Sequence, residues 1–171
     1  MRQASCLMVI DAQEGVFNLK RPVYNKGGLV ENINLLLNWA RVNNTRVYFS
    51  QHENSTFLKR GSASWEIVDG LTVDVSDVVI NKDKPGIFEG TQMHDRLKAG
   101  HISTIYVSGL ISNGCVKDTC LDALKYGFDV VLVADAHSTF YANAEKVIHH
   151  INEEIEKAGG TVIPTESLLR T

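Results

Sequence analysis

A strand, a glycine-bounded turn and a helix start follow one another in residues 104–115, which read TIYVSGLISNGC. The apolar run at 104–108 is typical of a strand that is buried on both faces of a parallel sheet. The turn at 109–114 leads into a helix that Cys115 opens. Unpaired backbone N–H groups and the positive end of the helix dipole favour a thiolate there. The stretch therefore predicts an α/β protein with a reactive cysteine at the carboxyl end of a strand.

Similar apolar runs recur along the chain, and helical patterns fill most of the gaps between them. The strand-like runs lie near 5–10, 46–50, 77–81, 103–108, 129–134 and 161–163, and the helical patterns at 29–40, 91–99, 115–126 and 141–158. Because such strands need helices on both faces, we expect a three-layer α/β/α sandwich. A doubly wound sheet would bind its ligand beyond the strand carboxyl ends. The aperiodic stretch 53–74 is expected to be a long ordered loop on that rim.

Length and composition favour one globular domain spanning 1–171. The chain has 44% hydrophobic and 22% charged residues and a net charge of −3, with no basic stripe that would indicate a nucleic-acid partner. Its apolar runs are too short to span a bilayer and no secretory leader is evident, so we expect a cytoplasmic protein without a membrane partner. Three cysteines without a Cys-x-x-Cys pattern argue against a disulfide framework. Cys6 and Cys120 fit the pattern of small buried hydrophobes.

Two further polar residues follow strand-like runs in the same way as Cys115. Asp11 ends the run at 7–10, and Lys82 follows the run at 78–81. Each has an ordinary alternative: Asp11 as a turn cap, and Lys82 as a solvated lysine with Lys84 as a rival for any role. Taken together, a carboxylate, an ammonium and a thiol at one rim of a sheet are the parts of an activated cysteine nucleophile.

Four ordered motifs resemble those of the isochorismatase-like cysteine hydrolases. They are Val9-Ile10-Asp11-Ala12-Gln13, the stretch 82–91 (KDKPGIFEGT), the stretch 109–119 (GLISNGCVKDT) and Val133-Ala134-Asp135-Ala136. The family's lysine stands six residues before a phenylalanine, which selects Lys82 because of Phe88. Ser112 occupies a position where the family has threonine. The resemblance runs nearly end to end and is closest to the metal-free branch.

The resemblance implies a Rossmann-like, six-stranded parallel sheet in 3-2-1-4-5-6 order and a catalytic triad of Asp11, Lys82 and Cys115. It also implies a non-proline cis peptide between Leu110 and Ile111, and an oxyanion hole made by the backbone N–H groups of Ile111 and Cys115. The implied enzyme is a hydrolase of carbon–nitrogen bonds other than peptide bonds. It would cleave a small amide, carbamoyl or urea-like compound through a thioester, with Asp11 as base and Lys82 as charge partner.

Neither a metal nor another cofactor is expected. Nicotinamidases of the family hold a metal with an Asp-x-His and a further His after the second strand, whereas residues 49–55 here supply only His52. His52 is instead a candidate for the pocket. The other residues expected near a small substrate are Phe17, Trp65, Phe88, Ile111 and Asn113, although core packing is the common fate of such aromatic side chains.

Three alternatives remain open at this point. Isochorismate cleavage is an ether hydrolysis that needs no thiol, so an intact Cys115 argues against it. A catalytically silent, oligomeric binding domain would keep the fold but have an unreactive Cys115. A thiol-redox role lacks an evident resolving partner. Family members commonly assemble through helix faces, so the resemblance also implies a homo-oligomer, either a dimer or a tetramer.

Overall fold

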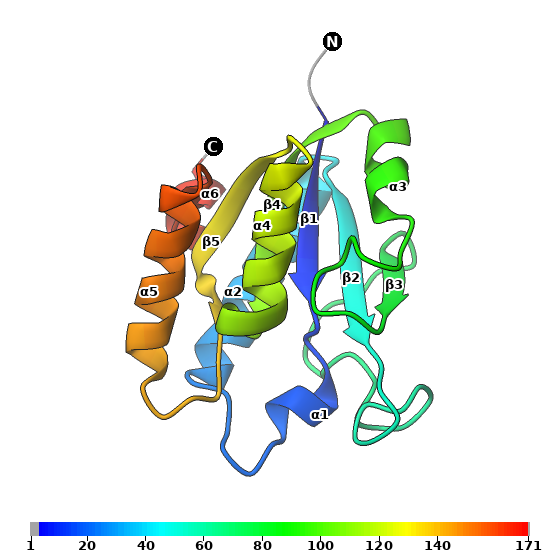
Figure 1. Ribbon diagram of the computed structural model, residues 1–171, viewed down its shortest axis with the longest axis vertical. Coiled ribbons are helices and arrows are strands. Elements are labelled where there is room, and N and C mark those ends of the chain that lie inside the picture. Colours follow the sequence, from blue (N-terminus) through cyan, green and yellow to red (C-terminus); the bar gives the residue numbers. More distant parts are fainter. Residues whose placement is uncertain (1–3, 171) are drawn as a thin grey trace.

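A six-stranded parallel sheet forms the centre of the computed structural model, which describes residues 4–170 (Figure 1). The strands are β1 (Ala4–Ile10), β2 (Arg46–His52), β3 (Val78–Lys82), β4 (Ile102–Leu110), β5 (Asp129–Ser138) and β6 (Thr161–Ile163). Their spatial order is β3-β2-β1-β4-β5-β6, and every neighbouring pair is parallel. The order confirms the predicted sheet. The winding direction reverses between β1 and β4, so their carboxyl ends form the switch point where α/β sheets bind ligands.

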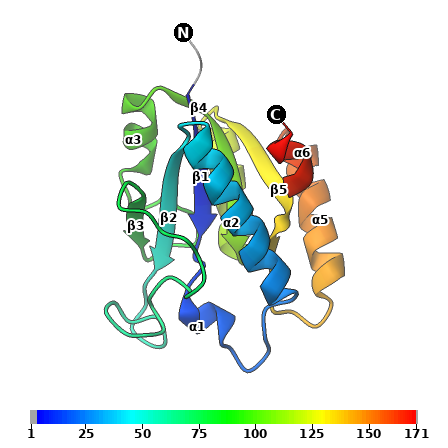
Figure 2. The same ribbon diagram turned by 180° about the vertical axis from the view of Figure 1, so that it is seen from behind.

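Helices cover both faces of the sheet, which confirms the predicted sandwich. Figure 1 shows α3 (Met93–Ala99), α4 (Lys117–Lys125) and α5 (Ala144–Lys157) on one face, and Figure 2 shows α2 (Lys26–Val42) and α6 (Thr165–Leu169) on the other. Successive residues of β1 serve the two cores in turn, because strand side chains alternate between faces. Met8 packs into the core under α3, α4 and α5, whereas Leu7 and Val9 pack into the core under α2.

The longest helix follows directly from its apolar spacing. Its fully or almost fully buried residues recur every three or four positions, as one face of an α-helix requires: Leu29, Ile33, Leu36, Leu37 and Ala40. Burying one such side chain contributes roughly 1.5–3 kcal/mol. The short helices α1 (Glu14–Phe17) and α6 were not predicted, because four or five residues are too few to show a helical period.

The turn that leads to Cys115 agrees with the prediction. Within Ser112–Val116, the backbones of Asn113 (φ −89°, ψ 17°) and Gly114 (φ −136°, ψ −113°) are not helical. The helical backbone therefore begins at Cys115 and continues through Val116 into α4. The peptide bond between Leu110 and Ile111 at the end of β4 is cis.

Gly109 sets the distance between the two strands that lead to the switch point. Its φ of +111° lies in the region that favours glycine, and a Cβ atom there would stand 2.2 Å from the carbonyl oxygen of Ile10. The β4–β5 pairing shifts register between Val107 and Gly109. Strand β4 therefore comes unusually close to β1 just before the turn that carries Cys115.

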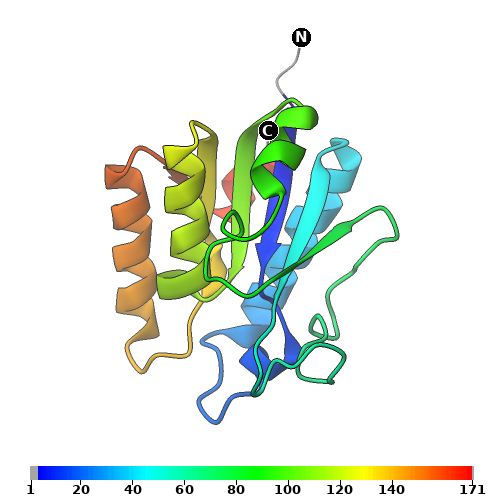
Figure 3. The ribbon, with the colours of Figure 1, turned by 45° about the vertical axis from the view of Figure 1, so that its right-hand side comes forward.

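A long irregular segment joins β2 to β3 beside α1, on the carboxyl side of the strands (Figure 3). The buried amide of Gln13 holds it in place: Nε2 donates to the carbonyl oxygens of His52 (2.9 Å) and Trp65 (2.8 Å), and Oε1 accepts from the His52 N–H (2.8 Å). The segment is thus an ordered loop on the rim. Within residues 4–170, no helix combines the length and the apolar character needed to cross a membrane.

Candidate active site

A buried ion pair lies at the carboxyl ends of β1 and β3. The Lys82 ammonium donates to Asp11 Oδ2 at 2.8 Å, and the two side chains are 0% and 4% exposed. Lys82 also donates to the carbonyl oxygens of Lys84 (3.0 Å) and Pro85 (2.9 Å). An ammonium has three N–H donors, and these three oxygens are its short contacts, with His52 Nδ1 at a longer 3.4 Å. The lysine is therefore held rigidly against the carboxylate.

Ser50 of β2 fixes the other side of the Asp11 carboxylate. Its hydroxyl donates to Asp11 Oδ1 at 2.6 Å and accepts from the Asp11 N–H at 3.1 Å. The backbone of Asp11 has a φ of +45°, a left-handed conformation in which the strand ends. Sequence reasoning missed Ser50, although a serine inside the apolar run of β2 was a visible signal. Since both carboxylate oxygens are engaged, Asp11 has one orientation.

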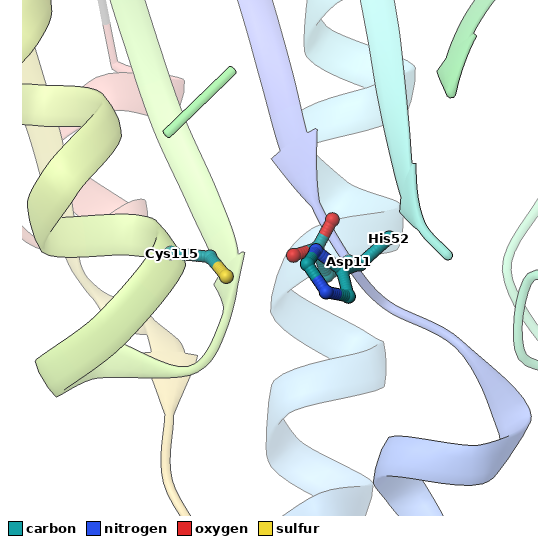
Figure 4. Close-up of side chains that lie close together, drawn as sticks. All are labelled: Asp11, His52 and Cys115. Carbon is teal, nitrogen blue, oxygen red and sulfur yellow. The ribbon is translucent and has the colours of Figure 1, made fainter. Parts of the chain in front are cut away.

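The thiol of Cys115 faces this ion pair from the turn after β4. Figure 4 shows its sulfur directed toward Asp11 and His52, which project from the ends of β1 and β2. One ligand-type atom from each of these three residues lies within 4.8 Å of the others. The structure thus brings together the three residues predicted from the sequence, Asp11, Lys82 and Cys115, and places His52 beside them.

Cys115 is a neutral thiol at rest, contrary to the thiolate predicted from its place near a helix start. Burial, and after it the negative charge of Asp11, raises the pKa of Cys115 to about 12, against a smaller lowering effect of Lys82. Loss of hydration and a nearby carboxylate outweigh the backbone dipoles at the helix start. The nucleophile therefore needs a base at the moment of attack.

His52 is partly buried and neutral. Burial and the adjacent Lys82 ammonium lower its pKa. Its Nδ1 lies 3.4 Å from Lys82 Nζ, and because an ammonium can only donate, Nδ1 accepts in this contact. The imidazole therefore adds a polar but uncharged group to the pocket.

A cavity of about 170 Å³ opens onto the thiol. Asp11, His52 and Cys115 line its base, and all its other lining residues are apolar: Val16, Leu19, Phe57, Leu58, Leu110, Ile111 and Phe140. They come from α1 and the segment that follows it, the 53–77 loop, the end of β4 with the residue after it, and the segment after β5. Except for Ile111, sequence reasoning missed these walls.

Of the six side chains predicted near the substrate, His52 and Ile111 line this cavity. Phe17 is 1% exposed and belongs to the core under α2, and Phe88 packs against Tyr126 and Phe128 in the opposite core. Trp65 contributes its carbonyl oxygen to the Gln13 anchor rather than its ring to the cavity. Asn113 accepts a hydrogen bond from Thr139 at 3.0 Å. Packing thus takes up the aromatic side chains, and the pocket prediction for these four residues is corrected.

The donor set of Asp11, His52 and Cys115 does not fit a divalent metal. Carboxylate, imidazole and thiolate are all zinc ligands, and within residues 4–170 they form the one such cluster. However, Asp11 already bonds the Lys82 ammonium and the Ser50 hydroxyl, one on each oxygen. A fixed positive charge 2.8 Å from one ligand oxygen opposes a second cation at the same place.

A buried histidine supports the turn that carries the thiol. His137 of β5 is 2% exposed, and its Nδ1 lies 2.8 Å from the hydroxyl of Ser112, the first residue of the turn. Its Nε2 lies 2.8 Å from Oδ1 of Asn152 on α5. With Nε2 donating to Asn152, Nδ1 accepts from Ser112. The pKa of His137 is lowered to about 4, and burial is the largest cause of this shift.

This histidine should make the fold sensitive to acid. The unfolded chain takes up a proton near pH 6.5, whereas folded His137 resists protonation down to about pH 4. Because the unfolded state binds more protons in that window, the free energy of unfolding falls as the pH drops from 6.5 to 4, by on the order of 3 kcal/mol. Urea unfolding at several pH values measures this loss.

The matched comparison uses His137→Gln and His150→Gln, since His150 is exposed on α5. His137→Gln should flatten the pH dependence of stability between 4 and 6.5, and His150→Gln should leave it close to that of the parent protein. Equal slopes for the parent and His137→Gln would contradict the assignment.

A carboxylate, an ammonium and a thiol thus meet at the carboxyl ends of a parallel sheet. The chain belongs to the isochorismatase family, a family of hydrolases: the model of the isochorismatase domain matches residues 5–167. It is 28% identical over 184 residues to the isochorismatase family protein YrdC of Bacillus subtilis, an alignment that covers 99% of this chain and 96% of that one.

Two further comparisons agree with this assignment. The ureidoacrylate amidohydrolase RutB of Methylobacterium radiotolerans is 29% identical over 100 residues, which cover 58% of this chain and 39% of that protein. The crystal structure of a cysteine hydrolase from Pseudomonas syringae pv. phaseolicola superposes with a TM-score of 0.90, at 22% identity, over 97% of this chain and 91% of the other. This last likeness concerns the fold.

Proposed function

We propose that the protein is a cysteine hydrolase that cleaves a C–N bond of a small amide, carbamoyl or urea-like compound through a covalent acyl–Cys115 intermediate. The observation that carries the proposal is a thiol facing a buried Asp11–Lys82 pair at the switch point of the sheet. The amidohydrolase named among the relatives supports the C–N bond class.

The first half of the reaction forms a thioester. Asp11 accepts the thiol proton while the Cys115 sulfur attacks the carbonyl carbon. The negative charge moves from the carboxylate toward the sulfur, and Lys82 favours this because its charge and hydrogen bond lower the pKa of the thiol. The backbone N–H groups of Ile111 and Cys115 stabilise the oxyanion. Protonated Asp11 then gives its proton to the leaving nitrogen, and the C–N bond breaks.

The second half returns the free enzyme. Asp11, again a carboxylate, takes a proton from a water molecule, which attacks the thioester carbonyl. The C–S bond breaks, the acid product leaves, and the sulfur regains its proton. Water is the only second substrate, and no redox step is needed. Asp11, as base and then as acid, serves both halves of the reaction.

A screen of small amides, carbamoyl compounds and ureido compounds tests the proposal. We expect ammonia release from at least one of these classes, together with an acyl adduct on the Cys115 peptide when the reaction is quenched and analysed by mass spectrometry. Hydroxylamine should intercept the thioester as a hydroxamate. Ammonia release without any adduct on Cys115, or no release from any class, would refute the mechanism.

Assembly stays a prediction of the family resemblance. We expect a homo-oligomer, and its mass in solution would measure the number of subunits. The cytoplasmic location expected from the sequence is likewise a prediction.

A further inference from the structure

The cavity in front of Cys115 offers a substrate no positive charge. Beyond the reactive groups at its base, its walls are hydrocarbon and aromatic and include Leu19, Phe57, Ile111 and Phe140. Among residues 4–170, no lysine or arginine lines it. A carboxylate of a substrate would have to lose its water there without gaining an ion pair, which is costly.

The charged groups at the base of the cavity are already paired. The Lys82 ammonium donates to Asp11, the Lys84 carbonyl and the Pro85 carbonyl at 2.8–3.0 Å, and its side chain is 0% exposed and does not line the cavity. It is therefore engaged with protein groups rather than open to a substrate anion. Burial keeps His52 neutral by lowering its pKa. The base of the cavity therefore presents the Asp11 carboxylate and its counter-ion, with no surplus of positive charge.

The proposed chemistry fixes which end of the substrate meets the apolar walls. Asp11 must reach the leaving nitrogen, so the nitrogen lies on the Asp11 side of the reacting carbonyl. The acyl substituent then extends away from Asp11 and meets the apolar lining residues. A cavity of about 170 Å³ is smaller than pockets for drug-sized ligands, which span roughly 300–1,000 Å³. It suits an acyl group of a few carbon atoms.

We propose that the substrates are small neutral amides with a hydrocarbon acyl group, and that amides bearing a carboxylate on that group are excluded. This inference rests on the proposed function and narrows its substrate class. Ureidoacrylate, the compound in the name of the relative RutB, carries a carboxylate and is therefore among the excluded substrates.

Two reagents of equal size test the charge preference without requiring turnover. Iodoacetamide is neutral and iodoacetate is anionic, and both alkylate thiols. With each rate divided by the rate for free cysteine, iodoacetamide should modify Cys115 at least about a hundredfold faster than iodoacetate, because the anion is buried without a partner.

A second pair tests the same preference in hydrolysis. In 4-methylpentanamide an isopropyl group replaces the carboxylate of succinamate, so the two amides share one shape and differ in charge. Ammonia should be released from 4-methylpentanamide at least about a hundredfold faster, measured as kcat/KM. If neither amide is hydrolysed, the narrowing to amides with a hydrocarbon acyl group is overturned, while the hydrolase proposal is decided by the wider screen described above. Faster hydrolysis of succinamate would overturn the neutral-substrate inference and leave the hydrolase proposal standing.

A charge placed in the wall provides the matched control. Phe140→Arg adds a cation to the cavity, whereas Tyr141→Arg adds the same charge at the adjacent exposed residue, which does not line it. Phe140→Arg should lower the ratio of the iodoacetamide rate to the iodoacetate rate at least about tenfold, since an ion pair becomes available to iodoacetate. Tyr141→Arg should leave the preference unchanged. Equal effects of the two variants would show that long-range charge, not the cavity wall, sets the preference.

Discussion

Replacing Cys115 by alanine is expected to lower amide hydrolysis by at least about ten-thousandfold. Removing the nucleophile from a set of residues that act together eliminates nearly all of their combined effect, which reaches about a millionfold in a comparable triad. The side chain is only partly buried and ends at the cavity, so its loss should disturb packing little. Steady-state ammonia release and thermal unfolding together measure both effects.

Cys120→Ala supplies the control for this experiment. Cys120 lies five residues further along the chain, 0% exposed in the core beneath α4, and the same burial raises its pKa well above the usual range. Its removal should cost some stability and leave turnover per folded molecule near the parent value. Hydrolysis by Cys115→Ala at more than about a tenth of the parent rate would refute the nucleophile assignment.

Replacing Asp11 by asparagine should separate hydrolysis from thiol reactivity. Hydrolysis should fall by about a thousandfold or more, because the base that serves both halves of the reaction is lost. Alkylation of Cys115 by iodoacetamide near neutral pH should instead become faster. The charge and hydrogen bond of Asp11 raise the pKa of the thiol, and without them Lys82 stabilises a thiolate.

The pH dependence of alkylation shows in which direction Asp11 shifts the pKa of Cys115. In the parent protein the pKa of Cys115 is about 12, so the thiolate fraction still rises well above neutral pH, whereas in Asp11→Asn the rise should occur at lower pH. Lys82→Met is the opposing variant, since loss of the ammonium removes the influence that lowers this pKa. It should slow both alkylation and hydrolysis. If alkylation of Asp11→Asn fell in parallel with hydrolysis, Asp11 could not be a base that holds the thiol protonated.

The sequence predicted which polar groups meet at the edge of the sheet better than it predicted the residues of the pocket, for a physical reason. Asp11, Lys82 and Cys115 each follow a buried strand of a parallel sheet, and the strand ends bring them together wherever the loops run. Leu19, Phe57 and Phe140 come from irregular segments, where no period connects a residue's position to its direction. Conversely, Phe17 and Phe88 stand next to motif residues but point into the two cores.

The charge state of Cys115 shows a second limit of sequence reasoning. The strand, turn and helix around it were predictable from residues 104–126, and local dipoles alone favour a thiolate there. The observed shift depends on burial and on a carboxylate more than a hundred residues away in sequence, which only the folded chain brings close. Ser50 was overlooked for a related reason, since its importance arises from the partner that it finds.

The anchoring of the rim loop by Gln13 has a consequence for how new specificities could arise. The Gln13 amide bonds to both His52 and Trp65, so the two ends of the segment between them are held at one side chain. Residues 53–64 between these attachments include Phe57 and Leu58 of the cavity wall but none of the catalytic triad. Insertions, deletions or grafts within 53–64 could therefore reshape substrate choice while the reacting groups keep their positions. The segment is an exchangeable module, and Gln13 is the position that directed evolution of this enzyme should leave untouched.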